Sequence, residues 1–522
     1  MNFPSKVVFR VDASLLIGNG HVMRCLTLAN VLAEGGAKCH FICREHKGHL
    51  FDIIHSHNHI LHSLSDEIID EENKPLSKDG HIKLSHASWL GCHWQVDAIQ
   101  SRNVIDKIKP DLLVIDHYAI DYAWESYVHD ESRKVMVIDD LANRRHLCDF
   151  LHDQTYRRKA KDYKRYIPVK TELLLGTRFS LLRPEFFKIR EYSLKRRSAN
   201  RSVIKQLLIS IGGVDSDNLT GKIITELLNT NLLNKMKVII VLGGNAPWRD
   251  DIVKLTKMAP KNNIEIKVDV TNMAEIASNS DLAIGAAGGS TWERCCLGVP
   301  TIQFVIAVNQ MKIANTLSEI HSVIDITISE VKKLKEIIAN MHNMLPKLSV
   351  ISSSIANGKG VYNVIDYLQH GRPSSSAIEL KAAAKNDCHY VYELQADSNV
   401  RKFFRKPDVP ELDEHIEWFN KKLNSDNSVL FVITKEYENV GIVRIDGLLE
   451  YVIEVSITVS PTFKGQGIAQ QTMSILIELL PNRIMKAVVH HHNIASQKVF
   501  EKMDFQLDFK EKLFWTYIRE IQ

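Results

Sequence analysis

Long hydrophobic runs, an apolar amino-terminal segment and a strong charge bias are all missing from this sequence. It has no run of about 18 apolar residues, the length that a membrane-spanning helix needs. The first ten residues, MNFPSKVVFR, lack the apolar core of a secretory signal, so we expect a cytoplasmic protein that does not contact membranes. The net charge of +4 is too mild to indicate a nucleic-acid partner, and no basic stripe with interleaved aromatics supports one.

Cysteine is sparse and unpaired in the sequence. Eight cysteines are scattered over 522 residues without a Cys-x-x-Cys pair, which is typical of reduced thiols in a cytoplasm. The histidine-rich stretch HSHNHILH (55–62) suggests either a zinc site or an exposed segment. No Asp, Glu or Cys pattern completes a structural site, so we expect no metal.

The length and composition predict about three globular domains. With 45% hydrophobic and 25% charged residues the chain has an ordinary globular composition, and domains usually span roughly 100–200 residues. We expect an α/β protein with an N-terminal lobe at 1–190, a second lobe at 200–370 and a third domain at 377–522. The charged segment 185–205 would connect the two lobes, and QHGRPSSSA (369–377) would tether the third domain.

The stretch RVDASLLIGNGHVMRCLTLANVLAEGG, from Arg10 to Gly36, places two glycines and a histidine between a strand and a helix. Apolar residues before it predict the strand, and apolar residues at helical spacing after it predict the helix. His21 therefore lies at a strand-to-helix junction, where open α/β sheets bind ligands. Gly18 and Gly20 would let a ligand approach the backbone, and Asp12 is a candidate to orient the His21 ring.

Paired glycines end three further strands in the middle of the chain. They occur in QLLISIGGVDSDN (206–218), KVIIVLGGNAP (237–247) and DLAIGAAGGSTWERCCLGVP (281–300). Any one of them could be a simple tight turn, but the three together predict a crevice that a ligand approaches closely. A helix N-cap is expected at Asp217 or Asn218.

The C-terminal region contains another strand, glycine turn and helix at 451–480. Its glycines would expose successive backbone N–H groups, and the start of the helix adds positive potential, which together suit a pyrophosphate. Downstream, Asn493 and Ser496 open a second helix after the strand IMKAVVH.

These C-terminal motifs resemble the GNAT acetyltransferase family over about 377–522. The resemblance implies an α+β domain that binds acetyl-CoA between two splayed strands. It places the pyrophosphate on the backbone of Gly465, Gln466, Gly467, Ile468 and Ala469, and the pantetheine arm beside Thr458, Val459 and Asn493. The tyrosine that often protonates the departing thiolate in this family is Phe500 here, which leaves the general acid unassigned. Glu454 is a candidate base for the amine, with an exposed structural carboxylate as the alternative.

The motifs RVDASLLIGNGHVMR and GAAGGSTWERCCLGVP resemble the nucleotide-sugar hydrolases of pseudaminic acid biosynthesis over about 1–370. This family is related to the two-lobed GT-B glycosyltransferases, so the fold class we expect is a GT-B-like pair of Rossmann-type domains followed by the GNAT domain. The resemblance implies hydrolysis of UDP-2,4-diacetamido-2,4,6-trideoxy-β-L-altrose to UDP and the free sugar. His21 matches the family's general base, which takes a proton from the attacking water.

The same resemblance implies a UDP-sugar site without a metal, because N–H groups and dipoles can take the charge of the leaving group. It assigns the phosphates to Gly288, Gly289, Ser290 and Thr291, the ribose to Glu293, and the donor sugar to Asn309, Gln310 and Tyr118.

The GNAT part resembles the enzyme that acts one step earlier, by acetylating the 4-amino group of UDP-4-amino-4,6-dideoxy-N-acetyl-altrosamine. Two alternatives remain open. One is a true GT-B glycosyltransferase, with a glycan as acceptor, fused to an acetyltransferase. The other is the same hydrolase carrying a non-catalytic GNAT-like module. The sequence leaves the stereochemistry of the sugar open.

Overall fold

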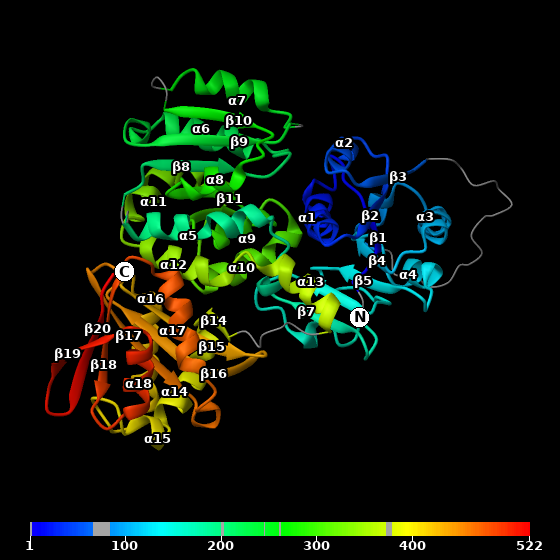
Figure 1. Cartoon of the computed structure of the whole chain (residues 1–522). Helices are drawn as coiled ribbons and strands as arrows, with labels where there is room; N and C mark the ends of the chain where they lie inside the picture. The colour runs from blue at the N-terminus through cyan, green and yellow to red at the C-terminus, as the bar shows by residue number, and fades with distance from the viewer. Residues whose placement is uncertain are drawn as a thin grey trace. The chain divides into compact units, whose positions relative to one another are not determined.

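The computed structural model describes residues 3–65, 84–199, 203–244, 246–259, 263–371 and 378–521 (Figure 1). The chain divides into two compact units. The first comprises Met1–Pro184, Gly243–Pro247 and Gly358–Ser374, and the second comprises Glu185–Leu242, Trp248–Asn357 and Ser375–Gln522. Among the described residues, no helix combines the length and the apolar character that crossing a membrane demands.

The first unit is a parallel seven-stranded sheet in the order β3-β2-β1-β4-β5-β6-β7. Its elements are β1 (Lys6–Val11), α1 (Gly20–Glu34), β2 (Lys38–Arg44), α2 (Phe51–Ser56), β3 (Ile60–Leu64), α3 (Trp94–Ile108), β4 (Leu112–Asp116), α4 (Tyr122–Val128), β5 (Lys134–Ile138), β6 (Phe150–Asp153), β7 (Glu172–Leu175) and α13 (Gly360–His370). The central strands are buried and largely apolar because helices cover both faces of the sheet, although β1 contains the buried Arg10. Gly360 has no room for a side chain, since a Cβ there would lie 2.2 Å from the Ser180 carbonyl oxygen.

A second parallel sheet, in the order β10-β9-β8-β11-β12-β13, forms one half of the second unit. Its elements are α5 (Pro184–Ala199), β8 (Gln206–Ser210), α6 (Leu219–Leu228), β9 (Lys237–Leu242), α7 (Arg249–Thr256), β10 (Ile264–Val268), α8 (Met273–Ser278), β11 (Leu282–Ala286), α9 (Ser290–Cys296), β12 (Thr301–Phe304), α10 (Met311–Glu319), β13 (Ile324–Asp325), α11 (Leu334–Asn340) and α12 (Leu345–Ile355). Asn218 caps α6 by accepting a hydrogen bond from the Gly221 N–H at 3.0 Å, as the sequence predicted.

The other half of the second unit is a mixed seven-stranded sheet in the order β14-β15-β16-β17-β18-β20-β19. Its elements are β14 (Ile378–Ala382), α14 (Cys388–Ala396), α15 (Ser398–Arg401), α16 (Leu412–Asn424), β15 (Ser428–Lys435), β16 (Glu438–Asp446), β17 (Val452–Val459), α17 (Ile468–Leu479), β18 (Ile484–His490), α18 (Ile494–Lys502), β19 (Gln506–Lys510) and β20 (Phe514–Arg519). Parallel β17 and β18 pair only from Val452 to Glu454 and then separate. The predicted fold class, two Rossmann-type sheets followed by an α+β domain with splayed strands, is confirmed.

The predicted connection at 185–205 is in its first part a helix that belongs to the second lobe. On α5, the buried Arg197 donates to the carbonyl oxygens of Leu297 and Ser280 at 3.0 and 2.7 Å. Arg190 donates to the carbonyl oxygen of Ser353 at 2.9 Å and also reaches Glu478 of α17 at 3.0 Å. The charged residues that made this segment resemble a solvated connection are therefore donors to backbone carbonyls and ion-pair partners.

The third domain packs against the second lobe and is not merely tethered to it, which corrects the expectation from the sequence. Residues 372–377 of the predicted tether lie outside the described residues, but α12 of the second lobe packs against α9 on one side and against β14 and α17 on the other. Nearly every residue of α12 is buried. A compositional change marks a domain boundary but does not reveal that a helix before it is buried on two faces.

Lys347→Met should lower the free energy of unfolding of the second unit by about 1–3 kcal/mol, the range for unsatisfied buried polar groups. Lys347, on α12, is 6% exposed and its ammonium donates to the carbonyl oxygens of Leu423 and Ser425 at 2.5 and 2.9 Å. Methionine fills the volume but leaves both carbonyls without their donor. Denaturant titration would measure the change, with exposed Lys335→Met on α11 as control. Equal stability of the two variants would contradict this role.

Candidate functional site

His21 is the second residue of α1 and lies where the chain enters that helix after β1. The turn before it closes with a hydrogen bond from the Gly18 N–H to the Ser14 carbonyl oxygen at 2.8 Å, and Gly18 adopts a φ of +81° that suits glycine. A Cβ on Gly18 or Gly20 would meet no atom within 4 Å. The strand-to-helix junction predicted from the sequence is confirmed.

Asp116, the last residue of β4, holds the His21 ring. Its Oδ1 lies 2.6 Å from His21 Nδ1. A carboxylate only accepts hydrogen bonds, so Nδ1 carries the proton and a neutral ring has its lone pair on Nε2. Among the described residues no hydrogen bond reaches Nε2, and His21 is 8% exposed.

Arg24, which also donates to Asp140, holds Asp116 in place. Arg24, one turn after His21, donates to Asp116 through Nε and Nη2, both at 2.6 Å, and through Nη1 to Asp140 at 3.0 Å. Burial alone would raise the pKa of Asp116, but the charges of Arg24 and His21 lower it well below its ordinary value. Asp116 is therefore an ionised acceptor that sets the ring's tautomer and orientation.

Asp12 does not orient His21, which corrects the expectation from the sequence. Its Oδ1 accepts hydrogen bonds from Arg10 Nη1 and from the Arg44 N–H, both at 2.7 Å. Its Oδ2 lies 3.2 Å from Nε2 of His117. Asp12 is closer to His21 in sequence, but the parallel order places β4 beside β1, so Asp116 reaches the ring instead. The sequence did contain a signal for Asp116, because this acid ends the buried apolar run LLVID.

Three aromatic side chains, Tyr118, Trp89 and His86, pack in sequence beside His21. The Tyr118 ring meets the His21 ring edge-on at 4.6 Å, and the Tyr118 hydroxyl donates to Asp140. Burial, and then the Asp140 charge, raise the pKa of Tyr118 well above its usual range. Trp89 stacks on Tyr118 at 5.5 Å, and His86 packs on Trp89 at 4.6 Å. The sequence identified Tyr118 but missed His86 and Trp89, because loop aromatics carry no pattern of their own.

The glycines after β11 lead directly into α9, with Gly289 as its N-cap residue. Gln310 lies beside Gly288, since its Nε2 would be 3.6 Å from a Cβ there. Ser290 accepts a hydrogen bond from the buried Arg294 at 3.0 Å. The structure therefore brings Gln310 to the segment formed by Gly288, Gly289 and Ser290, and all four were predicted for the UDP-sugar.

Thr291 and Arg294 support this loop from inside the protein. Thr291 is 1% exposed, and its hydroxyl lies 3.3 Å from the Ala286 carbonyl oxygen and 3.1 Å from Arg294 Nη2. Its N–H donates to the Gly288 carbonyl oxygen at 3.0 Å. Glu293 is half-buried on α9, and Asn309 is exposed in the short turn before α10. Because both polar groups of Thr291 are engaged, we assign it a supporting role in the loop.

The splayed strands and a glycine turn form the other candidate site. Thr458 and Val459 end β17 beyond its last pair with β18. Gly465 and Gly467 have φ values of +80° and +72°, and a Cβ on Gly465 would meet only open space. Gly467 is the N-cap residue of α17, so the backbone of Gln466, Ile468 and Ala469 borders the helix start.

Asn493, Phe500 and Glu454 have defined partners near the splayed strands. Asn493 caps α18 by accepting from the Ser496 N–H at 3.2 Å. Phe500 is buried and packs on Phe505 at 5.1 Å, so no hydroxyl replaces the missing tyrosine at this position. Glu454 pairs with Lys486 at 3.1 Å and is half-buried, which places a cation beside the candidate base.

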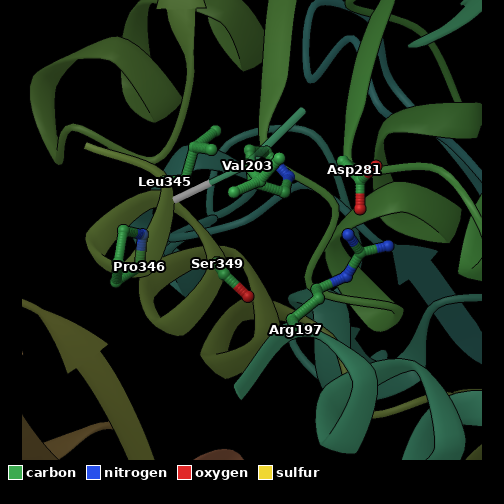
Figure 2. Close-up of a pocket in the computed structure, with 7 residues that line it drawn as sticks. Arg197, Val203, Asp281, Leu345, Pro346 and Ser349 are labelled. Atoms are coloured by element: carbon green, nitrogen blue, oxygen red, sulfur yellow. The ribbon is translucent and has the colours of Figure 1, made fainter. Parts of the chain in front are cut away.

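A pocket in the second unit is unrelated to these residues (Figure 2). Arg197, Val203, Asp281, Pro300, Leu345, Pro346 and Ser349 line it. It adjoins α5 and α12, and its buried arginine is engaged with carbonyl oxygens. None of the predicted site residues lines it.

Comparison with known proteins gives separate matches for the two ends of the chain. Residues 378–506 match the family model described as an acetyltransferase (GNAT) domain. The UDP-2,4-diacetamido-2,4,6-trideoxy-beta-L-altropyranose hydrolase of Campylobacter jejuni is 28% identical over 315 residues, which cover 60% of this chain and 96% of that protein. The chain joins a hydrolase-like N-terminal region to a GNAT acetyltransferase domain.

Two further relatives are similar to larger and smaller parts of the chain. An uncharacterized protein of Methanocaldococcus jannaschii is 24% identical over 518 residues, 96% of each chain. The spore coat polysaccharide biosynthesis protein SpsG of Bacillus subtilis is 24% identical over 212 residues, 39% of this chain and 60% of that protein. The similarities to the hydrolase and to SpsG, together with the GNAT domain, support a sugar-modifying enzyme with two activities.

Proposed function

We propose that the chain catalyses two consecutive reactions on one UDP-sugar. The GNAT domain N-acetylates the 4-amino group of UDP-4-amino-4,6-dideoxy-N-acetyl-altrosamine with acetyl-CoA. The N-terminal region then hydrolyses the resulting UDP-2,4-diacetamido-2,4,6-trideoxy-β-L-altrose to UDP and the free sugar. The observation that carries the proposal is the His21–Asp116 pair, with one ring nitrogen held and the other left for a substrate.

In the hydrolysis, His21 acts as general base. Its Nε2 takes a proton from a water as that water's oxygen bonds to the anomeric carbon. The bond from this carbon to the UDP oxygen breaks, and UDP leaves with the electron pair. Asp116 stabilises the imidazolium that forms, and Arg24 keeps Asp116 ionised and in place. This is why an aspartate at the end of β4 matters more than one at the end of β1.

Second-lobe residues would hold the UDP part without a metal. Gly288, Gly289 and Ser290 would approach the phosphates, Glu293 the ribose, and Asn309 and Gln310 the sugar. Gln310 beside Gly288 supports this arrangement, because both residues would then face one ligand. A glycosyltransferase would need the same residues, so UDP release in the absence of any acceptor glycan separates the two functions.

In the acetyl transfer, the sugar amine attacks the acetyl carbonyl of acetyl-CoA, and the thiolate departs from the tetrahedral intermediate. Glu454 would take the amine proton directly or through a water. Lys486, at 3.1 Å, would hold the Glu454 carboxylate in place. The backbone around Gly465 and Gly467 would hold the pyrophosphate, where the open space on Gly465 leaves room for it.

Replacing Glu293 by Ala should weaken UDP binding by about 1.5–3 kcal/mol, the range for hydrogen bonds to a charged group. Calorimetric titration of the full chain with UDP measures this directly. Exposed Glu336→Ala on α11 is the matched control, and acetyl-CoA binding should stay unchanged in both variants. UDP affinity equal to that of the parent protein would contradict the ribose contact. Glu293 would then only stabilise the first turn of α9.

A further inference from the structure

Three consecutive histidines gather where β18 leads into α18. His490 ends the strand, and His491 and His492 form the turn that follows. One ligand nitrogen from each lies within 4.8 Å of the other two. The ring centroids of His491 and His492 are 3.8 Å apart, and those of His490 and His491 are 4.8 Å apart.

The hydrogen bond of His491 prepares one of these nitrogens for a ligand. His491 Nδ1 lies 3.2 Å from the carbonyl oxygen of Leu513. A carbonyl only accepts, so Nδ1 carries the proton and Nε2 of the neutral ring keeps its lone pair. Histidines that ligate metals are usually held this way, with the second nitrogen donating to a carbonyl or carboxylate.

The neighbouring histidines are also confined. The His490 ring contacts Phe403 and Phe514, with centroid distances of 5.9 and 5.2 Å. His492 is exposed, and its N–H donates to His490 Nδ1 at 3.2 Å. Ligation by His490 therefore requires either release of this hydrogen bond or transfer of its ring proton from Nε2 to Nδ1.

The histidine-rich stretch that the sequence offered as a zinc site is different. There His59 Nε2 is 2.8 Å from the Asn30 Oδ1, and His57 Nδ1 is 3.0 Å from the same side-chain amide. His62 Nε2 lies 3.1 Å from His40 Nδ1. Within the described part of the chain, the ligand nitrogens of this stretch do not come together in a cluster that could hold an ion.

We propose that His490, His491 and His492 bind one divalent transition-metal ion of the zinc, nickel or copper class. Neutral imidazoles suit these ions, whereas magnesium and calcium prefer oxygen ligands. The turn is followed directly by Asn493, so the bound ion would lie next to a residue assigned to acetyl-CoA. The proposal depends on neither proposed reaction, and neither reaction requires the ion.

The test is metal binding by the full-length protein, measured with Co²⁺ through its visible absorption and with Zn²⁺ by calorimetry. Three variants are compared with the parent: His491→Ala/His492→Ala, His492→Ala alone, and the control His55→Ala/His57→Ala. His492, His55 and His57 are exposed, so replacing them does not endanger folding.

We expect the parent and the control to bind one more equivalent than the His491→Ala/His492→Ala variant. His492→Ala alone should weaken that equivalent at least tenfold. Equal stoichiometry and affinity in all four proteins, or loss of the equivalent in the control alone, would overturn the proposal. So would an absence of Co²⁺ and Zn²⁺ binding by the parent.

Discussion

His21→Ala is expected to slow UDP-sugar hydrolysis by about 10²–10⁴-fold, the usual contribution of a general base. UDP affinity should be largely kept, because other residues are assigned to the nucleotide. Asp116→Asn should slow the reaction comparably, since an amide that donates to Nδ1 moves the proton to Nε2 and removes the base's lone pair. The assay follows UDP release from the pre-acetylated substrate.

The control for this experiment is His55→Ala, an exposed histidine in the same unit that should retain parent activity. Acetyl transfer should be unchanged in all three variants. Hydrolysis by His21→Ala within tenfold of the parent would remove His21 from the mechanism. Full activity of Asp116→Asn would leave His21 as base but contradict the role given to its partner.

The second large effect is expected for Gly467→Val, which should abolish acetyl-CoA binding. At a φ of +72° a β-branched side chain is strained, and it would also project at the start of α17 where the pyrophosphate is assigned. Calorimetry with acetyl-CoA measures the loss, which we expect to exceed 100-fold. Hydrolysis of the pre-acetylated substrate should continue.

A matched control separates strain from contact. Gly371 ends α13 of the first unit with a φ of +71° and open space around a Cβ, so Gly371→Val imposes similar strain at a residue that is not assigned to the cofactor. Gly467→Asn relieves the strain, because asparagine tolerates this conformation, but still places a side chain at the helix start. Normal acetyl-CoA affinity in Gly467→Asn would show that only the backbone conformation matters.

The sequence predicted the elements of the site better than their connections. Local patterns were sufficient to place His21 at a strand-to-helix junction and Gly467 at the start of a helix, because both depend on a few neighbouring residues. The partner of His21 depends on the order of strands in the sheet. Asp12 follows the buried strand β1, and Asp116 is the last residue of the buried strand β4. Only the pairing of β1 with β4 decides which of the two reaches the ring.

Packing between domains was the least predictable feature. Nearly every residue of α12 is buried. Its Lys347 donates hydrogen bonds to carbonyl oxygens of the GNAT domain. In the sequence, LPKLSVISSSI is an ordinary helix with one lysine. Nothing local distinguishes a lysine in solvent from one that joins two domains.

The histidine clusters illustrate the same limit. Spacing raised a zinc site at HSHNHILH as one of two possibilities, and the absence of a completing Asp, Glu or Cys pattern argued against it; the rings of His59 and His62 contact Asn30 and His40. The run HHHN, in contrast, looked like the end of a strand, and only the position of the Leu513 carbonyl shows that one ring is held with a nitrogen free.

The most direct test of the account is one incubation of the full chain with UDP-4-amino-4,6-dideoxy-N-acetyl-altrosamine and acetyl-CoA in ¹⁸O-labelled water, without any acceptor glycan. Mass spectrometry would follow UDP, CoA and the sugar. We predict that UDP release depends on acetyl-CoA, that free 2,4-diacetamido-2,4,6-trideoxy-altrose accumulates, and that UDP carries no label because water attacks the anomeric carbon. UDP that carries the label, or acetylated UDP-sugar that persists until a glycan is added, would contradict it.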